Sequence, residues 1–347
     1  MKKYLYSLIL LLVISINAYA DGLTATLQQG DTFKYYSGKD AFTYAYAAAE
    51  DGAIITLSPG TFTDVASIKK QISIIGSSAF ETDQSKNTIL GSIVVACNKV
   101  KIEGIRFNGS VYFSSKDCFA YDAILKRCWV DGTLACNNYH YNTVIDQCVV
   151  RVDRAIVKGH NYCLKNSIVY SFKEMNSPDY LAYITNCIIR EFSHFSSYNP
   201  YQEDDDYKKP YAIYRNNLLG VYKSEDSQRV IDLNSPSEFY NNMFYAGDNQ
   251  TNMSSVSYIV SGRDVVLENN TKGHQKFNSY GLNGLYGINL VLPVDPPLGS
   301  DSTAIGPCGG SGFSLYPAIP RITSKKIDSY TNSEGKIRVQ ISVVAEQ

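Results

Sequence analysis

The chain has 347 residues and a formal net charge of −1, with 32 Lys and Arg residues against 33 Asp and Glu residues. This balance excludes the broad basic face that nucleic-acid binding requires, so we expect no nucleic-acid partner. Tyrosine is abundant (28 residues) while charged residues make up only 19%, which is typical of rigid β proteins with aromatic surfaces. We expect most of these tyrosines to fill strand faces.

Residues 1–20 have the pattern of a secretory signal peptide. Lys2 and Lys3 precede an apolar run over residues 5–16, and Ala18-Tyr19-Ala20 forms a small-residue cleavage frame. The run is shorter than the roughly 18 to 20 residues that a membrane span needs, and no later segment approaches that length. We therefore expect a mature chain from Asp21 that is secreted, or periplasmic or cell-surface, without a membrane span.

A polar leader over residues 21–37 is followed by a predicted helix at Asp40–Glu50. Asp40 is its expected N-cap, and Gly52 is expected to end it. The segments that follow predict a solenoid of stacked coils, and a solenoid has an apolar interior that is open at its end. An amphipathic helix before the first coil would cover that end. The apolar side of the helix is formed by Phe42, Tyr44, Ala45, Ala48 and Ala49.

Seven segments repeat one motif, in which two polar or small residues precede apolar ones. The second motif position falls at residues 128, 148, 167, 187, 217, 242 and 270, so the steps are 20, 19, 20, 30, 25 and 28 residues. A shortest repeat of about 20 residues, lengthened by insertions in some repeats, is typical of a solenoid, because a unit this short must stack on its neighbours. The segments are rich in β-branched and aromatic residues, and none shows a leucine-rich frame, which predicts a parallel β-helix.

The first motif position is mostly asparagine. Asparagine tolerates the left-handed backbone, and its amide can bond the equivalent amide one coil away. We expect such a ladder from Asn166, Asn186, Asn216, Asn241 and Asn269.

Three of the eight cysteines, Cys128, Cys148 and Cys187, share the second motif position. An exported chain with eight cysteines first suggests disulfides, but cysteines in register along a solenoid are better explained as packed thiols. We expect mostly unpaired cysteines, with adjacent-coil pairs as the exception.

One residue after the motif's apolar pair, four consecutive coils carry a polar or aromatic side chain. These residues, Asp131, Arg151, Tyr170 and Arg190, are expected to form one stripe. An aromatic face packs on a pyranose and arginine pairs with carboxylate or sulfate groups, so the stripe is a candidate sugar site. The favoured alternative is an ordinary strand flank in which Asp131 pairs with Arg151 across coils.

The insertion before the fifth repeat is acidic. Its carboxylates, Glu203, Asp204, Asp205 and Asp206, are a candidate calcium site, although consecutive acids on a loop usually point apart into water. Otherwise we expect no cofactor. The four histidines are scattered and have no Ser or Asp partner at recognisable spacing.

The tail over residues 311–347 alternates in polarity on both sides of a Ser-Glu-Gly turn. This pattern predicts a β-hairpin running from residues 319–322 to residues 335–343. It either packs on the last coils as a cap or serves as a small attachment module. The tail resembles the endings of exported β-helix proteins of gut Bacteroidetes.

The alanine-rich helix, Asp51-Gly52 and a strand ending in Ser58-Pro59-Gly60-Thr61-Phe62 resemble the opening of the pectin-lyase-like right-handed parallel β-helix superfamily. Ile72–Gly76 and Val100–Ile105 match it further, and Ser302–Pro307 is similar to its closing segment. The resemblance covers residues 38–310 and implies an all-β, right-handed parallel β-helix with an N-terminal capping helix and a C-terminal hairpin tail.

The resemblance implies a polysaccharide lyase, glycoside hydrolase or esterase, but fold does not confer function. The paired aspartates, Gly-His-Gly and Arg-x-Lys of the polygalacturonase-like hydrolases are absent, and Gly159-His160-Asn161 is a partial echo. The Trp-x-Asp-His motif of pectate lyases is absent too.

Three classes of function therefore stay open. We favour an exported protein that binds polysaccharide or a cell-surface glycan without catalysis. The alternatives are a divergent lyase or hydrolase acting in the groove of the β-helix, and a passive structural or adhesive rod.

Overall fold

The structure is a computed structural model of the whole chain. It describes residues 22–113, 120–136, 140–151, 155–157, 161–174, 181–193, 211–221, 230–233, 237–246, 258–261, 265–272, 295–316, 321–327, 335–337 and 339–344. The signal-peptide prediction therefore lies outside the described residues. No helix among the described residues is long and apolar enough to cross a membrane.

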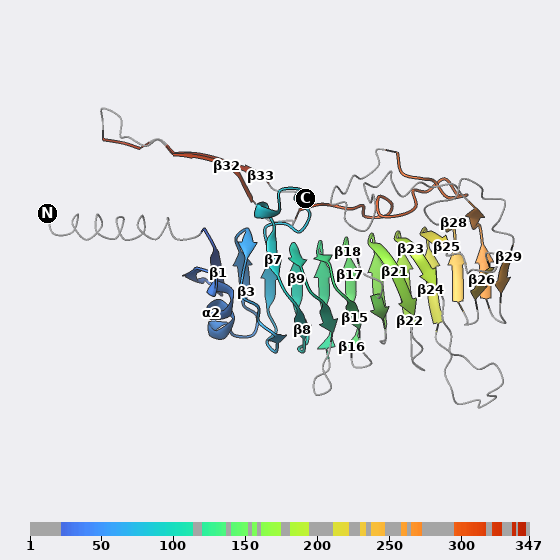
Figure 1. Cartoon of the computed structure of the whole chain (residues 1–347), viewed down its shortest axis with the longest axis horizontal. Helices are drawn as coiled ribbons and strands as arrows, with labels where there is room; N and C mark the ends of the chain where they lie inside the picture. Colours follow the sequence, from blue (N-terminus) through green and yellow to red (C-terminus); the bar gives the residue numbers. More distant parts are fainter. Residues whose placement is uncertain are drawn as a thin grey trace.

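Two long sheets build the molecule (Figure 1). The twelve strands of sheet A are, in spatial order, β2 (Thr32–Ser37), β1 (Thr24–Gln29), β3 (Ile54–Leu57), β6 (Ser73–Ile75), β9 (Lys101–Glu103), β13 (Ile124–Lys126), β17 (Val144–Asp146), β20 (Tyr162–Lys165), β22 (Leu181–Thr185), β24 (Tyr211–Arg215), β27 (Ser237–Tyr240) and β30 (Val265–Glu268).

Sheet B has fifteen strands because its two halves merge at long strands. Its first half comprises β4 (Gly60–Thr61), β7 (Thr88–Leu90), β10 (Ile105–Phe107), β14 (Trp129–Val130), β18 (Val149–Val150), β21 (Ile168–Glu174), β23 (Ile188–Ser193), β25 (Leu218–Val221), β28 (Met243–Ala246) and β31 (Thr271–Lys272). The second half comprises β19 (Ala155–Val157), β15 (Leu134–Cys136), β11 (Val111–Phe113), β8 (Ile93–Val95) and β5 (Ser67–Ile68).

Three pairs of strands stand apart from the long sheets. They are β12 (Ala120–Tyr121) with β16 (His140–Tyr141), β26 (Val230–Leu233) with β29 (Tyr258–Ser261), and β32 (Arg321–Ile327) with β33 (Val339–Val344). The last pair is antiparallel, which confirms the hairpin predicted in the tail.

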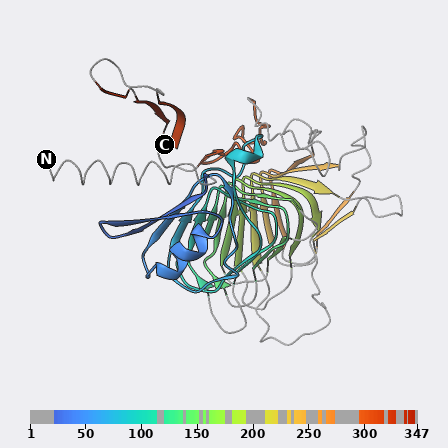
Figure 2. The same ribbon diagram turned by 60° about the vertical axis from the view of Figure 1, so that its left-hand side comes forward.

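Each strand of a coil pairs in parallel with the equivalent strand of the next coil. On sheet A, for example, Leu125 is opposite Ile145, and Ile145 is opposite Leu164. These three side chains are buried in one core cluster that extends along the coils. The fold is therefore a parallel β-helix, as the repeat predicts, and Figure 2 shows its stacked coils obliquely.

The leader expected at residues 21–37 contributes two strands. β1 and β2 form an antiparallel hairpin, and β1 adds antiparallel to β3, the first strand of the coils. The sequence signal was Gly30-Asp31 between two short alternating runs, and Gly30 has a φ of 55°. β2 is consequently the outermost strand of sheet A.

The predicted helix is present as α2 (Ala41–Ala48), shorter than expected. Ala41, Phe42 and Ala45 are buried in the core cluster, so α2 covers the apolar interior at the N-terminal end. Three details of the prediction are wrong. Asp40 stands at the N-cap but its side chain makes no capping hydrogen bond, and the helix ends at Ala48 with Ala49 as its C-cap, before Gly52. Tyr44 is 55% exposed and Ala48 is exposed too, instead of facing the core.

The first motif position has the left-handed backbone that the sequence predicts. It marks the corner between sheet A and sheet B in the seven coils that carry the motif, and Gly104, with a φ of 68°, occupies the same corner between β9 and β10. The residues with positive φ at this corner are Arg127 (50°), Gln147 (56°), Asn166 (47°), Asn186 (54°), Asn216 (57°), Asn241 (53°) and Asn269 (56°).

The second motif position supplies a donor to the backbone at the same corner. The thiol of Cys187 donates to the carbonyl of Thr185 at 3.2 Å, and the hydroxyl of Ser167 donates to that of Lys165 at 2.7 Å. The amide of Asn217 donates to the carbonyl of Ile184 at 2.8 Å. The carbonyls of Thr185 and Lys165 also accept the N–H groups of Asn166 and Gln147, each at 3.1 Å, so these small side chains add a second donor at the turn.

Six of the described cysteines are free thiols, and Cys118 lies outside the described residues; the six are Cys128, Cys136, Cys148, Cys163, Cys187 and Cys308. Burial raises the pKa of the Cys136 and Cys187 thiols, so both stay protonated at neutral pH. Cys128 and Cys148 lie at the same corner as Cys187, and each donates its thiol to a backbone carbonyl. These thiols are therefore packed donors, as the register of the repeat suggested.

Residues 295–316, which we call the strap, run back along this corner from the last coils to the first (Figure 1). At one end Ser300 donates to the carbonyl of Asn269 at 2.7 Å. At the other end Ser78 donates to the carbonyl of Leu315 at 3.5 Å. The strap is thus continuous across residue 310, where we expected the tail to begin.

The strap also covers a line of apolar side chains on the outside of sheet B, which we call the covered cluster. Ile305 of the strap is fully buried, and Phe313 and Leu315 pack on the same cluster. Phe313 and Phe80 contact edge to face, with ring centroids 5.4 Å apart. The covered cluster on sheet B consists of Trp129, Val149, Ile168, Ile188 and Leu218, all at most 3% exposed.

Candidate functional site

The outward face of sheet A carries two rows of side chains across the coils. We call the first the apolar row, which follows the registered positions Ile124, Val144, Cys163, Tyr183 and Ile213. We call the second the charged row, which follows Glu103, Lys126, Asp146, Lys165, Thr185, Arg215, Tyr240 and Glu268. Both rows run perpendicular to the strands, at the strand spacing of ~4.8 Å.

The apolar row contains an exposed aromatic side chain. Tyr183 is 42% exposed, and the other members of the row are half-buried. The N-terminal hairpin continues the same outward face, since Phe33 is opposite Gln28 and Gln28 is opposite Ile54. Phe33 is 54% exposed and Tyr35, two residues on, is 76% exposed. Aromatic rings are therefore exposed to solvent at two places on sheet A, at Tyr183 and on the N-terminal hairpin.

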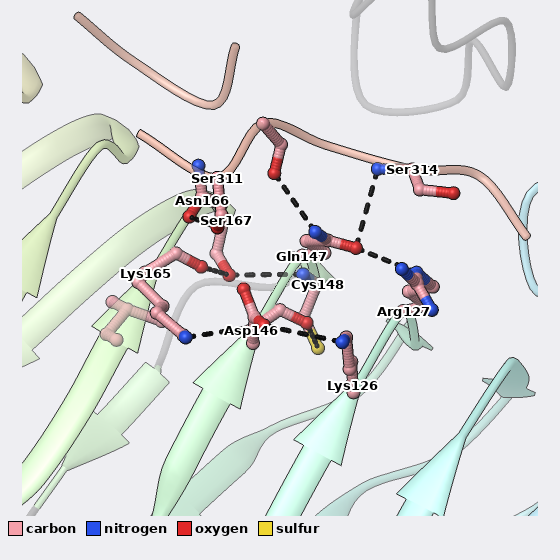
Figure 3. A network of polar contacts seen from close by, with 12 residues as sticks. Lys126, Arg127, Asp146, Gln147, Cys148, Lys165, Asn166, Ser167, Ser311 and Ser314 are labelled. Carbon is pink, nitrogen blue, oxygen red and sulfur yellow. Dashed lines mark hydrogen bonds and ion pairs between the residues drawn. The ribbon is translucent and has the colours of Figure 1, made fainter. Parts of the chain in front are cut away.

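The charged row centres on Asp146, which lies between two lysines (Figure 3). Its Oδ2 atom is 3.6 Å from Nζ of Lys165 and 4.0 Å from Nζ of Lys126. Burial raises the pKa of Asp146, and the attraction of Lys165 and Lys126 opposes that rise. The Oδ1 atom is buried without a hydrogen-bond partner, which agrees with a net cost of burial.

Beside the charged row, the corner residues form a second polar network. Nη1 of Arg127 donates to Glu103 at 2.6 Å, and Nε donates to Oε1 of Gln147 at 2.8 Å. Gln147 in turn donates to the carbonyl of Gly312 in the strap at 3.0 Å (Figure 3). This network links sheet A to the strap and is part of the scaffold.

The asparagines of the first motif position mostly bond the strap. Asn166 donates to the carbonyls of Pro307 and Gly309 at 3.0 and 2.6 Å, and Asn186 donates to that of Ala304 at 3.3 Å. One bond of the expected ladder is found, from Asn241 to Asn216 at 2.9 Å. The longer amide ladder occupies the second motif position instead.

The first two residues of the predicted stripe, Asp131 and Arg151, form an ion pair. Nη1 of Arg151 is 3.2 Å from Oδ1 of Asp131, the cross-coil pair that we favoured as the alternative to a sugar site. Asp131 also accepts from Nε and Nη2 of Arg106 at 3.1 and 2.9 Å and from Nε1 of Trp129 at 2.9 Å. Its carboxylate is therefore saturated by protein donors.

The other members of the stripe give less information. Tyr170 is half-buried on β21, and the side chain of Arg190 lies outside the described residues. The candidate calcium ligands Glu203, Asp204, Asp205 and Asp206 also lie outside them. Within the described part of the chain, no three His, Cys, Asp or Glu residues are grouped as a metal site.

Sequence reasoning missed the outward face of sheet A and the corner where it begins. There Asp122, Asn142 and Asn161 have φ values of 56°, 56° and 55°, and Asn142 donates to Asp122 at 3.1 Å. The signal was present, since the steps between these residues are 20 and 19 positions, as in the repeat we used. A strand placed two residues after each corner would have aligned both outward rows.

Comparison of this chain with protein-family models, with curated proteins and with solved structures finds no match.

Proposed function

We propose that this chain is an exported β-helix protein that binds glycan through the outward face of sheet A, without catalysis. The observation that carries the proposal is the exposure of Tyr183 in an apolar row that crosses five coils. A flat exposed aromatic ring packs against the apolar face of a pyranose. The adjoining charged row supplies hydrogen-bond donors and acceptors for sugar hydroxyl groups.

The shape of the face supports an extended ligand. Its two rows repeat at ~4.8 Å, close to the advance of one sugar in an extended chain. The five positions from Ile124 to Ile213 span about 20 Å at this spacing, enough for several sugars. Membership of the pectin-lyase-like superfamily and secretion through residues 1–20 belong to the same proposal and rest on the sequence motifs.

The stripe on sheet B supports a scaffold role better than a binding role. The carboxylate of Asp131 accepts hydrogen bonds from Arg106, Arg151 and Trp129. The strap covers the apolar side chains of sheet B beside it. We therefore assign the candidate surface to sheet A.

The test compares two tyrosine variants of the mature chain, residues 21–347. Tyr183→Ala removes the exposed ring of the apolar row, whereas Tyr112→Ala removes a 36% exposed tyrosine from β11 of sheet B. Retention on immobilised plant, host and microbial polysaccharides should fall at least about tenfold for Tyr183→Ala and stay unchanged for Tyr112→Ala.

Soluble reaction products are recorded in the same experiment, as unsaturated uronides and as new reducing ends. Product formation would replace the proposal with an enzyme. Absence of both retention and products on every polysaccharide would favour the structural rod. Equal losses for both variants would contradict the assignment to sheet A.

A further inference from the structure

The charged row has no net charge. Its anions are Glu103, Asp146 and Glu268 and its cations are Lys126, Lys165 and Arg215, so the formal charges sum to zero. The signs alternate over the first four positions, from Glu103 to Lys165. Because neighbours one coil apart are in lateral contact, opposite charges neutralise each other along the row.

The cations of the row are engaged within the protein. Lys126 and Lys165 share the carboxylate of Asp146, at 4.0 and 3.6 Å. The guanidinium of Arg215 lies over the ring of Tyr240, 5.3 Å from its centroid. At the adjoining corner Arg127 is paired with Glu103.

We infer that the ligand of this face is an uncharged polysaccharide lying along the axis of the β-helix. This inference rests on the proposed function and adds the chemical class of the glycan. A carboxylated or sulfated chain would compete with Asp146 for the two lysines and would pass the carboxylates of the row at close range. A neutral chain avoids that repulsion, and its hydroxyl groups can donate to carboxylates and accept from ammonium groups in the same row.

The direct test measures retention of the wild-type chain on neutral β-linked glucan, xylan and mannan and on polygalacturonate. Measurements are made at about 20 mM and about 500 mM NaCl, because salt screens exposed charge pairs. The wild type should bind a neutral polysaccharide with an affinity that changes less than about twofold with salt, and should not bind polygalacturonate.

A charge variant makes the test sharper. Asp146→Asn keeps the shape of the side chain but leaves Lys126 and Lys165 without their shared carboxylate. It should gain at least about fivefold in binding to polygalacturonate at low salt and lose that gain at high salt. Asp83→Asn is the matched control, because Asp83 pairs with Lys86 on the exposed helix η2 (Gln84–Lys86), away from sheet A, and should gain nothing.

The outcomes separate the inference from the proposed function. Salt-sensitive binding of the wild type to polygalacturonate in preference to neutral chains would overturn the inference and leave glycan binding standing. No gain by correctly folded Asp146→Asn would also count against it. Failure of every polysaccharide to bind would remove the proposed function itself.

Discussion

The side-chain amide of Asn217 donates to the side-chain oxygen of Asn242, one coil further along, at 2.9 Å. Asn242 repeats the contact with Asn270 at 3.0 Å. Each oxygen in this ladder also accepts a backbone N–H, since Oδ1 of Asn217 accepts from Cys187 at 2.8 Å. The amides thus bond both to one another and to the backbone of the turns that separate sheet A from sheet B.

Asn217→Ala should destabilise the β-helix strongly. Asn217 is fully buried, and its loss removes a donor from the carbonyl of Ile184 and an acceptor from the N–H of Cys187. Each buried polar group left unsatisfied costs about 1–3 kcal/mol, so we expect a loss of about 2–5 kcal/mol in the free energy of unfolding. Urea denaturation followed by circular dichroism measures it.

The control for this variant comes from the chain itself, because cysteine occupies the same position at residues 128, 148 and 187. Asn217→Cys keeps a donor at the corner and should cost less than Asn217→Ala. Equal costs for the two variants would show that the amide bonds do not stabilise the corner.

Removal of the strap should expose the single tryptophan. Trp129 is 2% exposed and contacts Phe80, which packs on Phe313 of the strap. A chain ending at residue 294 should therefore show red-shifted tryptophan emission and faster quenching by acrylamide, with the circular dichroism of the sheets retained.

A point variant guards against misfolding of the shortened chain. Ile305→Ala removes a fully buried strap side chain and should cost about 2–4 kcal/mol, with part of the same change in quenching. Ile337→Ala, at a 54% exposed position in the C-terminal tail, should change neither. Unchanged quenching in both the shortened chain and Ile305→Ala would contradict coverage of Trp129 by the strap.

Asp146 makes the stability of the fold depend on pH in a defined direction. Burial raises its pKa above the unfolded value of about 3.9, so the folded state holds this proton more tightly than the unfolded state does. The tighter proton binding adds to the free energy of unfolding at pH values below the unfolded pKa, and this stabilisation is lost as the pH rises through the folded pKa. Asp146→Asn should therefore be at least as stable as the wild type at pH 7.

The measurement is the difference in unfolding free energy between Asp146→Asn and the wild type from pH 3 to pH 7. We expect the advantage of the variant to shrink as the pH falls towards about 4. A variant that is less stable at pH 7 and gains on acidification would show that the two lysines outweigh the burial of the carboxylate.

Asp131→Ala should be among the most damaging charge substitutions. It leaves the guanidinium of Arg106, whose side chain is 6% exposed, without its ion-pair partner. Loss of one partner from a buried pair costs about 3–5 kcal/mol. Arg151→Ala, at a side chain 21% exposed, should cost less than about 1 kcal/mol and leave glycan retention unchanged. Loss of retention by folded Arg151→Ala would return the binding site to the predicted stripe.

The parts of this fold that repeat locally could be predicted from the sequence. The left-handed corner at Asn166, Asn186, Asn216, Asn241 and Asn269 follows from asparagine recurring at one position of the repeat, Arg127 and Gln147 follow from the same position of the motif, and α2 follows from its alanines. The hairpin of β32 and β33 follows from alternation around a glycine turn.

The strap could not be predicted, because its contacts join residues more than 100 positions apart, such as Asn166 with Pro307. The sequence therefore predicted that the asparagines of the first motif position bond one another, whereas Asn166 and Asn186 bond the strap instead. The outward face of sheet A was missed for a related reason. The relation of Lys126 to Asp146 and Lys165 depends on the exact register of three strands, and a shift of one residue would turn those side chains inward.

The most direct test of the account is hydroxyl-radical footprinting of the mature chain with and without a retained neutral polysaccharide. Oxidation of Tyr183 should fall at least about threefold when the glycan is present, whereas oxidation of Tyr112, on sheet B, should not change. Protection of Tyr112 with Tyr183 left fully reactive would contradict binding on the outward face of sheet A.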